Sequence, residues 1–257
     1  MKTSIIVPYK NAGPWIGRCV ESLKAQKGNF VFLFINDGST DDGEAIAKEA
    51  AGSDPRFLWF DNERRPGVSG ARNTGITHAT GDYVAFLDAD DELHPDAWKT
   101  AENGQNGPYS IVQYNHIRQY RNGRTAIKHK NPDGMHGIDD MPPLWEWVTN
   151  KVFRREFIRG IWFEERLQYG EDELFMLECL AVEPKIRCVD GVMMVHHFDN
   201  TESLSKQKRE VDLWRQIGEI ERFLIRQGDP ALRCFVCDWL SVHWRSESFK
   251  RLIGHAT

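Results

Sequence analysis

The sequence predicts an α/β fold with a doubly wound, mostly parallel central sheet flanked by helices, followed by a C-terminal helical extension. Three observations support this prediction. Short apolar runs and helical patterns alternate three times before residue 90. The runs are continuous, as in strands buried on both faces. Each run ends in a loop rich in Gly, Pro, Asp or Asn, which are the residues that favour turns between elements.

Four strands are expected in this first half, at residues 4–7, 30–35, 57–60 and 83–87. Three helices are expected to connect them. The first begins at Pro14 with apolar residues at spacings of three and four, the second passes through 45–50, and the third covers 70–79. In a parallel sheet connected in this way, ligands bind at the carboxyl ends of the strands, and we expect the loops at those ends to form one pocket.

The fourth strand ends in a cluster of acids, Asp88, Asp90, Asp91 and Glu92. Placing this charge at the end of a buried strand is unfavourable unless a cation or hydrogen-bond donors meet it. Asp88 and Asp90 lie two residues apart, so in extended backbone both side chains would leave on the same side. Two such oxygen ligands suit Mg²⁺ or Mn²⁺. The alternative is a solvated acidic turn that caps the helix expected near Pro95.

The pattern changes in the second half. A helix is expected at 95–103, two strands at 110–120 and 124–130 joined by a tight turn at Asn122-Gly123, a loop at 131–143 and a helix at 144–158. Residues 171–173 are acidic and begin an apolar helix, and a strand follows at 186–195. Residues 206–257 form two amphipathic helices rich in Trp and Arg, divided at 228–230.

Composition limits the classes of function. The 257 residues are 40% hydrophobic, enough for a substantial core, and the net charge of −5 gives no support for a nucleic acid partner. We expect no signal peptide before the first strand, and no apolar run approaches the roughly 20 residues that span a bilayer. The five scattered cysteines favour a reducing compartment, and hence the cytoplasm.

Four segments occur in an order and spacing that resemble the family-2 glycosyltransferases, which have the GT-A fold. They are Ile5-Ile6-Val7-Pro8-Tyr9-Lys10-Asn11, Asn36-Asp37-Gly38-Ser39-Thr40-Asp41, Gly67-Val68-Ser69-Gly70-Ala71-Arg72-Asn73-Thr74-Gly75 and Phe86-Leu87-Asp88-Ala89-Asp90-Asp91. The segment from Asn150 to Asp172 also resembles the acceptor side of that family. The resemblance implies a catalytic domain at 1–205, with a nucleotide-binding half at 1–94 and an acceptor-binding half at 95–205, and an extension at 206–257.

The resemblance also implies which residues form the site. The nucleotide-binding residues would be Pro8, Tyr9, Asn11, Asp37, Arg72, Asp88 and Ala89. A carboxylate can accept a hydrogen bond from a uracil or guanine N–H, and an arginine fork suits base edges and phosphates. The alternative to nucleotide binding is that Asp37 only forms a turn before Gly38 and that Arg72 is a surface residue of a helix. The segment Val7-Pro8-Tyr9-Lys10-Asn11 departs from the commoner Val-Pro-x-Tyr-Asn of the family. The sequence therefore does not identify which residue stacks on the base.

Asp88 and Asp90 resemble the D-x-D metal motif, with Asp90 expected in direct contact with the metal. His197 is expected as a third metal ligand, with His196 and Asn200 as the other candidates, because a GT-A enzyme often places a ligand there. This stretch departs from the family's usual Tyr-Tyr-Arg. A structural role for the His pair is the alternative.

Asp172 matches the family's catalytic base, with Glu171 and Glu173 as competing candidates. A hydroxyl is a poor nucleophile until a carboxylate takes its proton, an effect typically worth ~10²–10⁴-fold. The alternative explanation for the three acids is stabilisation of a helix N-terminus.

We therefore expect an inverting, metal-dependent glycosyltransferase that uses a nucleotide-sugar donor, with UDP favoured, and a glycan or lipid-linked acceptor in surface polysaccharide synthesis. A sugar-nucleotide nucleotidyltransferase and a non-catalytic nucleotide- or carbohydrate-binding module are the alternatives. The Trp- and Arg-rich C-terminal helices suggest peripheral contact at the inner face of the membrane. Packing of these helices on the catalytic domain or on a second subunit in an oligomer is the favoured alternative.

Overall fold

The computed structural model describes residues 1–128, 134–136, 147–182, 184–198, 210–228 and 236. Within them one ten-stranded sheet has the order β3-β2-β1-β4-β9-β6-β10-β5, with β7 paired to β6 and β8 to β10. The elements are β1 (Thr3–Tyr9), α1 (Gly13–Lys24), β2 (Phe30–Asn36), α2 (Gly43–Ala51), β3 (Phe57–Asp61), α3 (Val68–His78), β4 (Tyr83–Phe86), β5 (Glu92–Leu93), α4 (Ala97–Gln105), β6 (Ile111–Gln119), β7 (Thr125–Lys128), β8 (Gly134–His136), β9 (Lys151–Arg154), α5 (Glu171–Leu180), β10 (Ile186–His197) and α6 (Glu210–Gln227).

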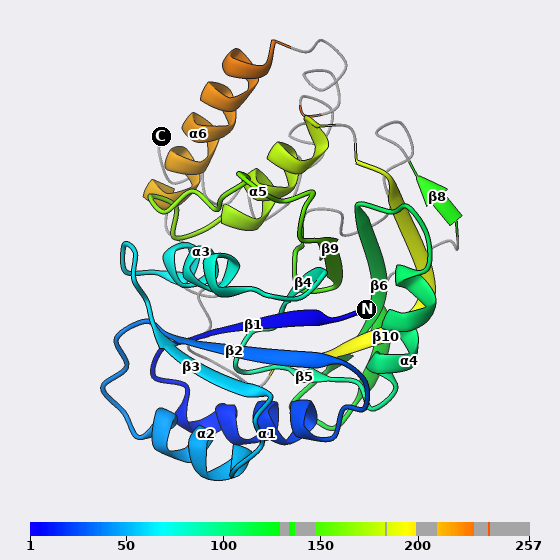
Figure 1. Cartoon of the computed structure of the whole chain (residues 1–257). Helices are drawn as coiled ribbons and strands as arrows, with labels where there is room; N and C mark the ends of the chain where they lie inside the picture. Colours follow the sequence, from blue (N-terminus) through cyan, green and yellow to red (C-terminus); the bar gives the residue numbers. More distant parts are fainter. Residues whose placement is uncertain (129–133, 137–146, 183, 199–209, 229–235, 237–257) are drawn as a thin grey trace.

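The first half has the predicted parallel arrangement. β1 pairs in parallel with β2 and with β4, and β2 pairs in parallel with β3. Helices α1 and α2 lie on one face of the sheet, and α3, α5 and α6 lie on the other (Figure 1). The two hydrophobic clusters of the core fill these two interfaces. At Gly75 a Cβ atom would lie 2.3 Å from Cγ2 of Ile6, so the glycine allows α3 to pack closely against β1.

The second half is mixed. β9 lies between β4 and β6 and is antiparallel to both, whereas β10 is parallel to β6. The predicted helix at 144–158 is therefore wrong over Lys151–Arg154, and its start lies outside the described residues. Val152 and Phe153 are fully buried, and the backbone of β9 is paired on both edges. A helix was predicted here, but the segment lies between two strands of one sheet, where only a strand can pair with both.

Other expectations for this half are confirmed. The turn at Asn122-Gly123 joins β6 to the antiparallel strand β7, and Gly123 has a φ of 76°. The acidic residues 171–173 begin α5. Helix α6 buries Ile220 and Phe223 in the core cluster that also contains residues of α5, so it packs against the rest of the fold. Several features of the sequence lie outside the described residues. They are the predicted second C-terminal helix, Asn200, Cys234 and Cys237. No helix in the described part of the chain is long and apolar enough to cross a membrane.

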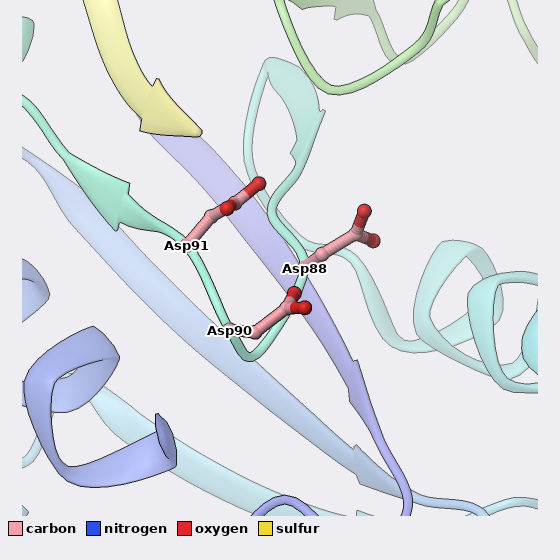
Figure 2. Close-up of side chains that lie close together, drawn as sticks. All are labelled: Asp88, Asp90 and Asp91. Atoms are coloured by element: carbon pink, nitrogen blue, oxygen red, sulfur yellow. The ribbon is translucent and has the colours of Figure 1, made fainter. Parts of the chain in front are cut away.

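The strand directions bring the loops of both halves to one edge of the sheet. Because β9 is antiparallel to both of its neighbours, β6 and β10 run in the same direction as β1, β2 and β4. The carboxyl ends of these five strands therefore lie at the same edge, together with the amino end of β9. The acidic turn that follows β4 lies at this edge, and Figure 2 shows its three aspartates.

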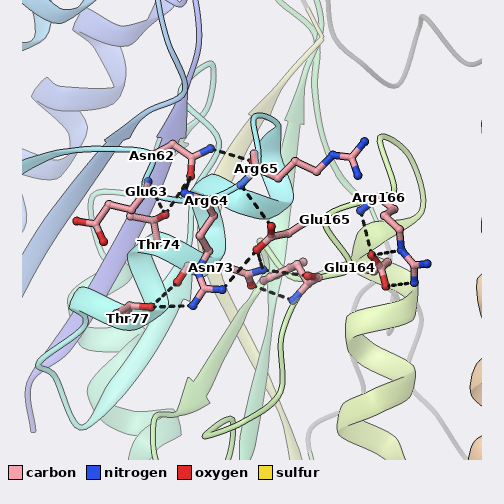
Figure 3. Close-up of polar contacts among 11 residues, drawn as sticks. Asn62, Glu63, Arg64, Arg65, Asn73, Thr74, Thr77, Glu164, Glu165 and Arg166 are labelled. Atoms are coloured by element: carbon pink, nitrogen blue, oxygen red, sulfur yellow. Dashed lines mark hydrogen bonds and ion pairs between the residues drawn. The ribbon is translucent and has the colours of Figure 1, made fainter.

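A polar network connects the loop between β3 and α3 to residues 163–166 of the second half (Figure 3). Asn73 of α3, which is 1% exposed, is its centre. Its side chain donates to the carbonyl of Phe163 at 2.9 Å and to Glu165 at 3.0 Å, and it accepts from the Phe163 amide at 2.9 Å. Asn62 accepts from Thr74 at 3.0 Å. The network therefore holds the two halves in a fixed relation beside the site.

We predict that Asn73→Ala destabilises the protein by about 1–3 kcal/mol, because it leaves the buried amide and carbonyl of Phe163 without their partner. Equilibrium denaturation in urea measures this change. Asn106→Ala is the matched control, since Asn106 is exposed. Equal stability of the two variants would contradict the structural role of Asn73.

Candidate functional site

A cavity of about 870 Å³ lies at the carboxyl edge of the sheet. Eight of the ten predicted site residues line it: Pro8, Tyr9, Asp37, Arg72, Asp88, Ala89, Asp90 and Asp172. The other two, Asn11 and His197, do not. Residues from both halves of the chain thus form one site, as the strand directions require.

Asp37, at the end of β2, forms one end of the cavity. It is 8% exposed, and its carboxylate accepts hydrogen bonds from the Gly67 amide at 2.9 Å and from Nδ2 of Asn62 at 2.7 Å. Nζ of Lys10 lies 3.5 Å away. Gly67 has a φ of 133°, a backbone conformation that favours glycine. The loop before α3 therefore fixes the orientation of Asp37. An aspartate that only formed a turn would not need these contacts.

Tyr9 and Asn11 differ in their placement. Tyr9 is buried in the cavity wall, and burial together with the neighbouring Glu44 raises its pKa. Asn11 lies outside the lining and has a φ of 49°. Its side chain accepts from the Thr40 amide at 2.8 Å, so its observed contact is with the loop after β2.

The acidic turn brings three carboxylates together. Oxygen atoms of Asp88, Asp90 and Asp91 lie within 4.8 Å of one another, and Figure 2 shows them on the turn after β4. The Asp91 amide donates to the Asp88 carbonyl at 3.0 Å, so the backbone turns here and is not extended as predicted. The close approach of Asp88 and Asp90 comes from this turn. Three hard oxygen donors at one point fit a divalent cation such as Mg²⁺ or Mn²⁺.

The histidines at the end of β10 point in opposite directions. His196 lines the cavity, and its Nδ1 lies 2.9 Å from Asp91. Asp91 outweighs the effect of burial and raises the pKa of His196, while burial raises the pKa of Asp91 to about 6. His197 bonds to Glu92 at 2.6 Å and does not reach the cavity. Successive side chains of a strand alternate between faces, so His197 does not line the cavity with Asp88 and Asp90, and its role as a third metal ligand stays a prediction.

Arg72 of α3 connects the acidic turn to the start of α5. It is 3% exposed, and its guanidinium donates to Asp172 at 2.6 Å, to Glu171 at 3.0 Å and to Asp88 at 3.1 Å. The ring of Phe163 lies 5.2 Å from the guanidinium carbon. The three carboxylates raise the pKa of Arg72 despite its burial, so it stays charged. Arg72 is therefore not the surface residue of the alternative interpretation.

Asp172, at the start of α5, has a strongly altered acidity. Burial raises its pKa to about 7, against the lowering effect of Arg72 and of the Val148 amide, which lies 3.4 Å away. A carboxyl with this pKa exchanges a proton near neutral pH, as a general base must. Glu173, in contrast, is buried against Gln216 of α6.

The sequence did not predict one wall of the cavity. Arg118 and Phe198, at the ends of β6 and β10, and Trp147, before β9, line it. These residues carry no motif, and the loop that contains Trp147 was assigned to a helix. The only available signal was the placement of strand ends at one edge of the sheet.

Comparisons with known proteins agree with this geometry. The sequence model described as glycosyl transferase family 2 matches residues 4–168. The chain is 27% identical over 218 residues to the uncharacterized glycosyltransferase EpsJ of Bacillus subtilis, covering 79% of this chain and 62% of that protein. It is 39% identical over 189 residues to the putative glycosyltransferase EpsH of the same organism, covering 67% and 54%. The chain thus spans less than two thirds of the length of either relative.

Solved structures share the fold. TarS of S. aureus in complex with UDP-GlcNAc matches with a TM-score of 0.82 at 19% identity, covering 97% of this chain and 75% of that one. The mannosyltransferase PcManGT of Pyrobaculum calidifontis in complex with GDP-Man and Mn²⁺ matches with a TM-score of 0.63 at 17% identity, covering 90% and 68%. These matches confirm the predicted α/β GT-A fold.

We predict that the Asp172 carboxyl of the free protein titrates near pH 7 and that Arg72→Gln raises its pKa further. The Arg72 charge favours the ionised carboxylate, so its removal favours the protonated form. Carboxyl ¹³C NMR over pH 4 to 9 measures both values. Arg64→Gln, which removes a partly exposed charge from the loop before α3, is the control. A lower Asp172 pKa in Arg72→Gln would contradict this account of the site.

Proposed function

The chain belongs to glycosyltransferase family 2, and from this premise we propose an inverting, metal-dependent transfer of a sugar from a UDP-sugar to a hydroxyl of a glycan or lipid-linked acceptor in surface polysaccharide synthesis. One observation supports this proposal above all. Asp37, the acidic turn and Asp172 line the same cavity, and Arg72 bonds directly to the last two.

The donor nucleotide is proposed to lie at the Asp37 end, against Pro8 and Tyr9. Asp37 is oriented by Gly67 and Asn62, and a carboxylate there can accept a hydrogen bond from the N–H of uracil. The fold shared with TarS, which was solved in complex with UDP-GlcNAc, supports UDP as the nucleotide. From this end the diphosphate would extend toward the acidic turn.

Asp90 and Asp88 are proposed to hold Mn²⁺ or Mg²⁺, with Asp91 supporting the turn through His196. The metal, when bound, neutralises charge on the leaving diphosphate. Asp88 also bonds to Arg72, so its carboxylate is oriented before a metal arrives. The fold shared with PcManGT, solved with GDP-Man and Mn²⁺, supports a divalent metal as the cofactor.

Asp172 is proposed as the general base. It takes the proton of the acceptor hydroxyl, and its pKa near 7 suits this task at neutral pH. Because it lies across Arg72 from the acidic turn, the attacking hydroxyl would approach from the side opposite the leaving diphosphate. Attack from that side inverts the anomeric centre. We propose the acceptor class from the family resemblance, and a cytoplasmic location at the inner face of the membrane from the composition.

We predict that UDP, among UDP, dTDP, GDP and CMP, raises the melting temperature most, and that Mn²⁺ increases this effect. A ligand at about 100 times its Kd adds ~2.7 kcal/mol of stability. Asp90→Ala should remove the Mn²⁺-dependent part, while Asp96→Ala, which removes an exposed charge outside the cavity, should not. A thermal-shift screen measures all of these. A folded protein that responds to none of the nucleotides with Mn²⁺ would contradict the proposed donor class.

We predict that Asp172→Asn binds UDP and Mn²⁺ as the wild type does but loses ~10²–10⁴-fold in transfer rate, because the amide cannot take the proton. Calorimetry measures the binding, and release of UDP from UDP-sugar in the presence of acceptor measures the rate. Transfer at a near wild-type rate would show that another group is the base. Glu171→Gln distinguishes the nearest competitor.

A further inference from the structure

The wall of the cavity that the sequence did not predict holds an arginine between two aromatic rings. The guanidinium carbon of Arg118 lies 5.3 Å from the ring centroid of Trp147 and 5.4 Å from that of Phe198. Its Nε lies 3.4 Å from Nε2 of His116, which is 1% exposed. The two ring contacts and the contact at Nε restrain the guanidinium and leave its two Nη groups for another ligand.

The rings themselves are held in place. Lys151, which is fully buried, donates from Nζ to the Trp147 carbonyl and to Asn150 at 2.9 Å. His196 contacts both rings, with centroids 5.6 Å from Trp147 and 4.7 Å from Phe198, and is itself bonded to Asp91. The arginine is therefore presented by a built wall and not by a surface loop.

Arg118 makes no ion pair with any of the described residues. This distinguishes it from Arg72, which meets three carboxylates in the same cavity. A charged fork that is partly buried and lacks an acidic partner is a favourable site for an anion, because carboxylate and phosphate oxygens match its two parallel N–H donors.

Its position separates this site from the proposed nucleotide end. In the sheet order, β6 lies two strands beyond β4, on the side away from β1 and β2. Four strand spacings, roughly 19 Å, separate β6 from β2 and Asp37. On the same side, Trp147 is followed directly by Val148, whose amide donates to Asp172. The arginine therefore lies on the side of the base.

We infer that Arg118 is a binding residue for an anionic group of the acceptor, so that the acceptor carries a phosphate or a carboxylate near the hydroxyl that is glycosylated. Trp147 and Phe198 orient the arginine, and their exposed edges contact the carbon skeleton beside the anion. This inference rests on the proposed function, since it takes Asp172 as the residue that the acceptor hydroxyl meets.

Matched pairs of small probes test this inference. Calorimetry on the full chain compares the binding of sn-glycerol 3-phosphate with that of glycerol, and the binding of glucuronate with that of glucose. Each comparison is made on the protein alone and on the protein with UDP and Mn²⁺. We expect at least one charged probe to bind roughly tenfold tighter than its neutral match, as for a charge-assisted bidentate contact. The pair that shows the preference identifies phosphate or carboxylate as the group.

Arg118→Gln should remove this preference and leave UDP affinity within about twofold. Arg124→Gln is the control, because it removes an exposed charge from the same hairpin, outside the cavity. Arg118→Lys keeps the charge without the fork and should retain part of the preference. The melting temperatures of all three variants show whether each is folded. If Arg118→Gln does not fold, Arg118→Lys tests the inference in its place.

The outcomes are distinct. No preference for either charged probe in the wild type, or a preference that survives in Arg118→Gln, overturns the inference while leaving the proposed donor untouched. A large loss of UDP affinity in Arg118→Gln also overturns it and assigns the arginine to the donor diphosphate. An Arg118-dependent preference in a protein that does not bind UDP supports the anion site and contradicts the proposed function.

Discussion

The contact of Arg72 with Asp88, Glu171 and Asp172 is the interaction on which the site depends. An arginine that is 3% exposed is unfavourable without carboxylate partners, and three carboxylates this close are unfavourable without a cation. Each side of the contact therefore requires the other. The contact joins α3, the turn after β4 and the start of α5, which are separated in sequence by up to 100 residues. It sets the distance between the proposed metal site and the proposed base, and it keeps the pKa of Asp172 from rising further.

The sheet topology makes this contact available. Parallel strands place their carboxyl ends at one edge, and β9 extends the sheet without reversing that edge, because it is antiparallel to both neighbours. The amino end of β9 consequently lies where the other strands end, and it brings Trp147 and Val148 to the cavity. The first half of the chain supplies Asp37 and the acidic turn, and the second half supplies Asp172, the proposed base, and the wall formed by Arg118, Trp147 and Phe198. The Asn73 network keeps the two halves together on the α3 face.

Local patterns predicted the first half well, because the continuous apolar runs there coincide with the buried strands β1, β2 and β4 and with the edge strand β3. The acidic end of the run at 83–87 also led to the proposed cation site. Extended backbone was expected there, and the observed turn at Asp88–Asp91 adds Asp91 to the cluster. The second half was harder. Val152 and Phe153 were predicted to lie in a helix, and their strand conformation depends on β4 and β6, which are distant in sequence. The choice between His196 and His197 depended on which face of β10 meets the cavity, and no sequence pattern in that strand specifies it.

The central claim is that Asp37, the acidic turn and Asp172 form one transferase site. The most direct measurement is a crystal structure of the protein with UDP and Mn²⁺, with the metal located by its anomalous scattering. The account predicts uracil against Asp37, a manganese peak within coordination distance of Asp90, and the Asp172 carboxylate open to the cavity on the far side of the diphosphate. A nucleotide bound elsewhere, or a manganese peak away from the turn at Asp88–Asp91, would contradict it.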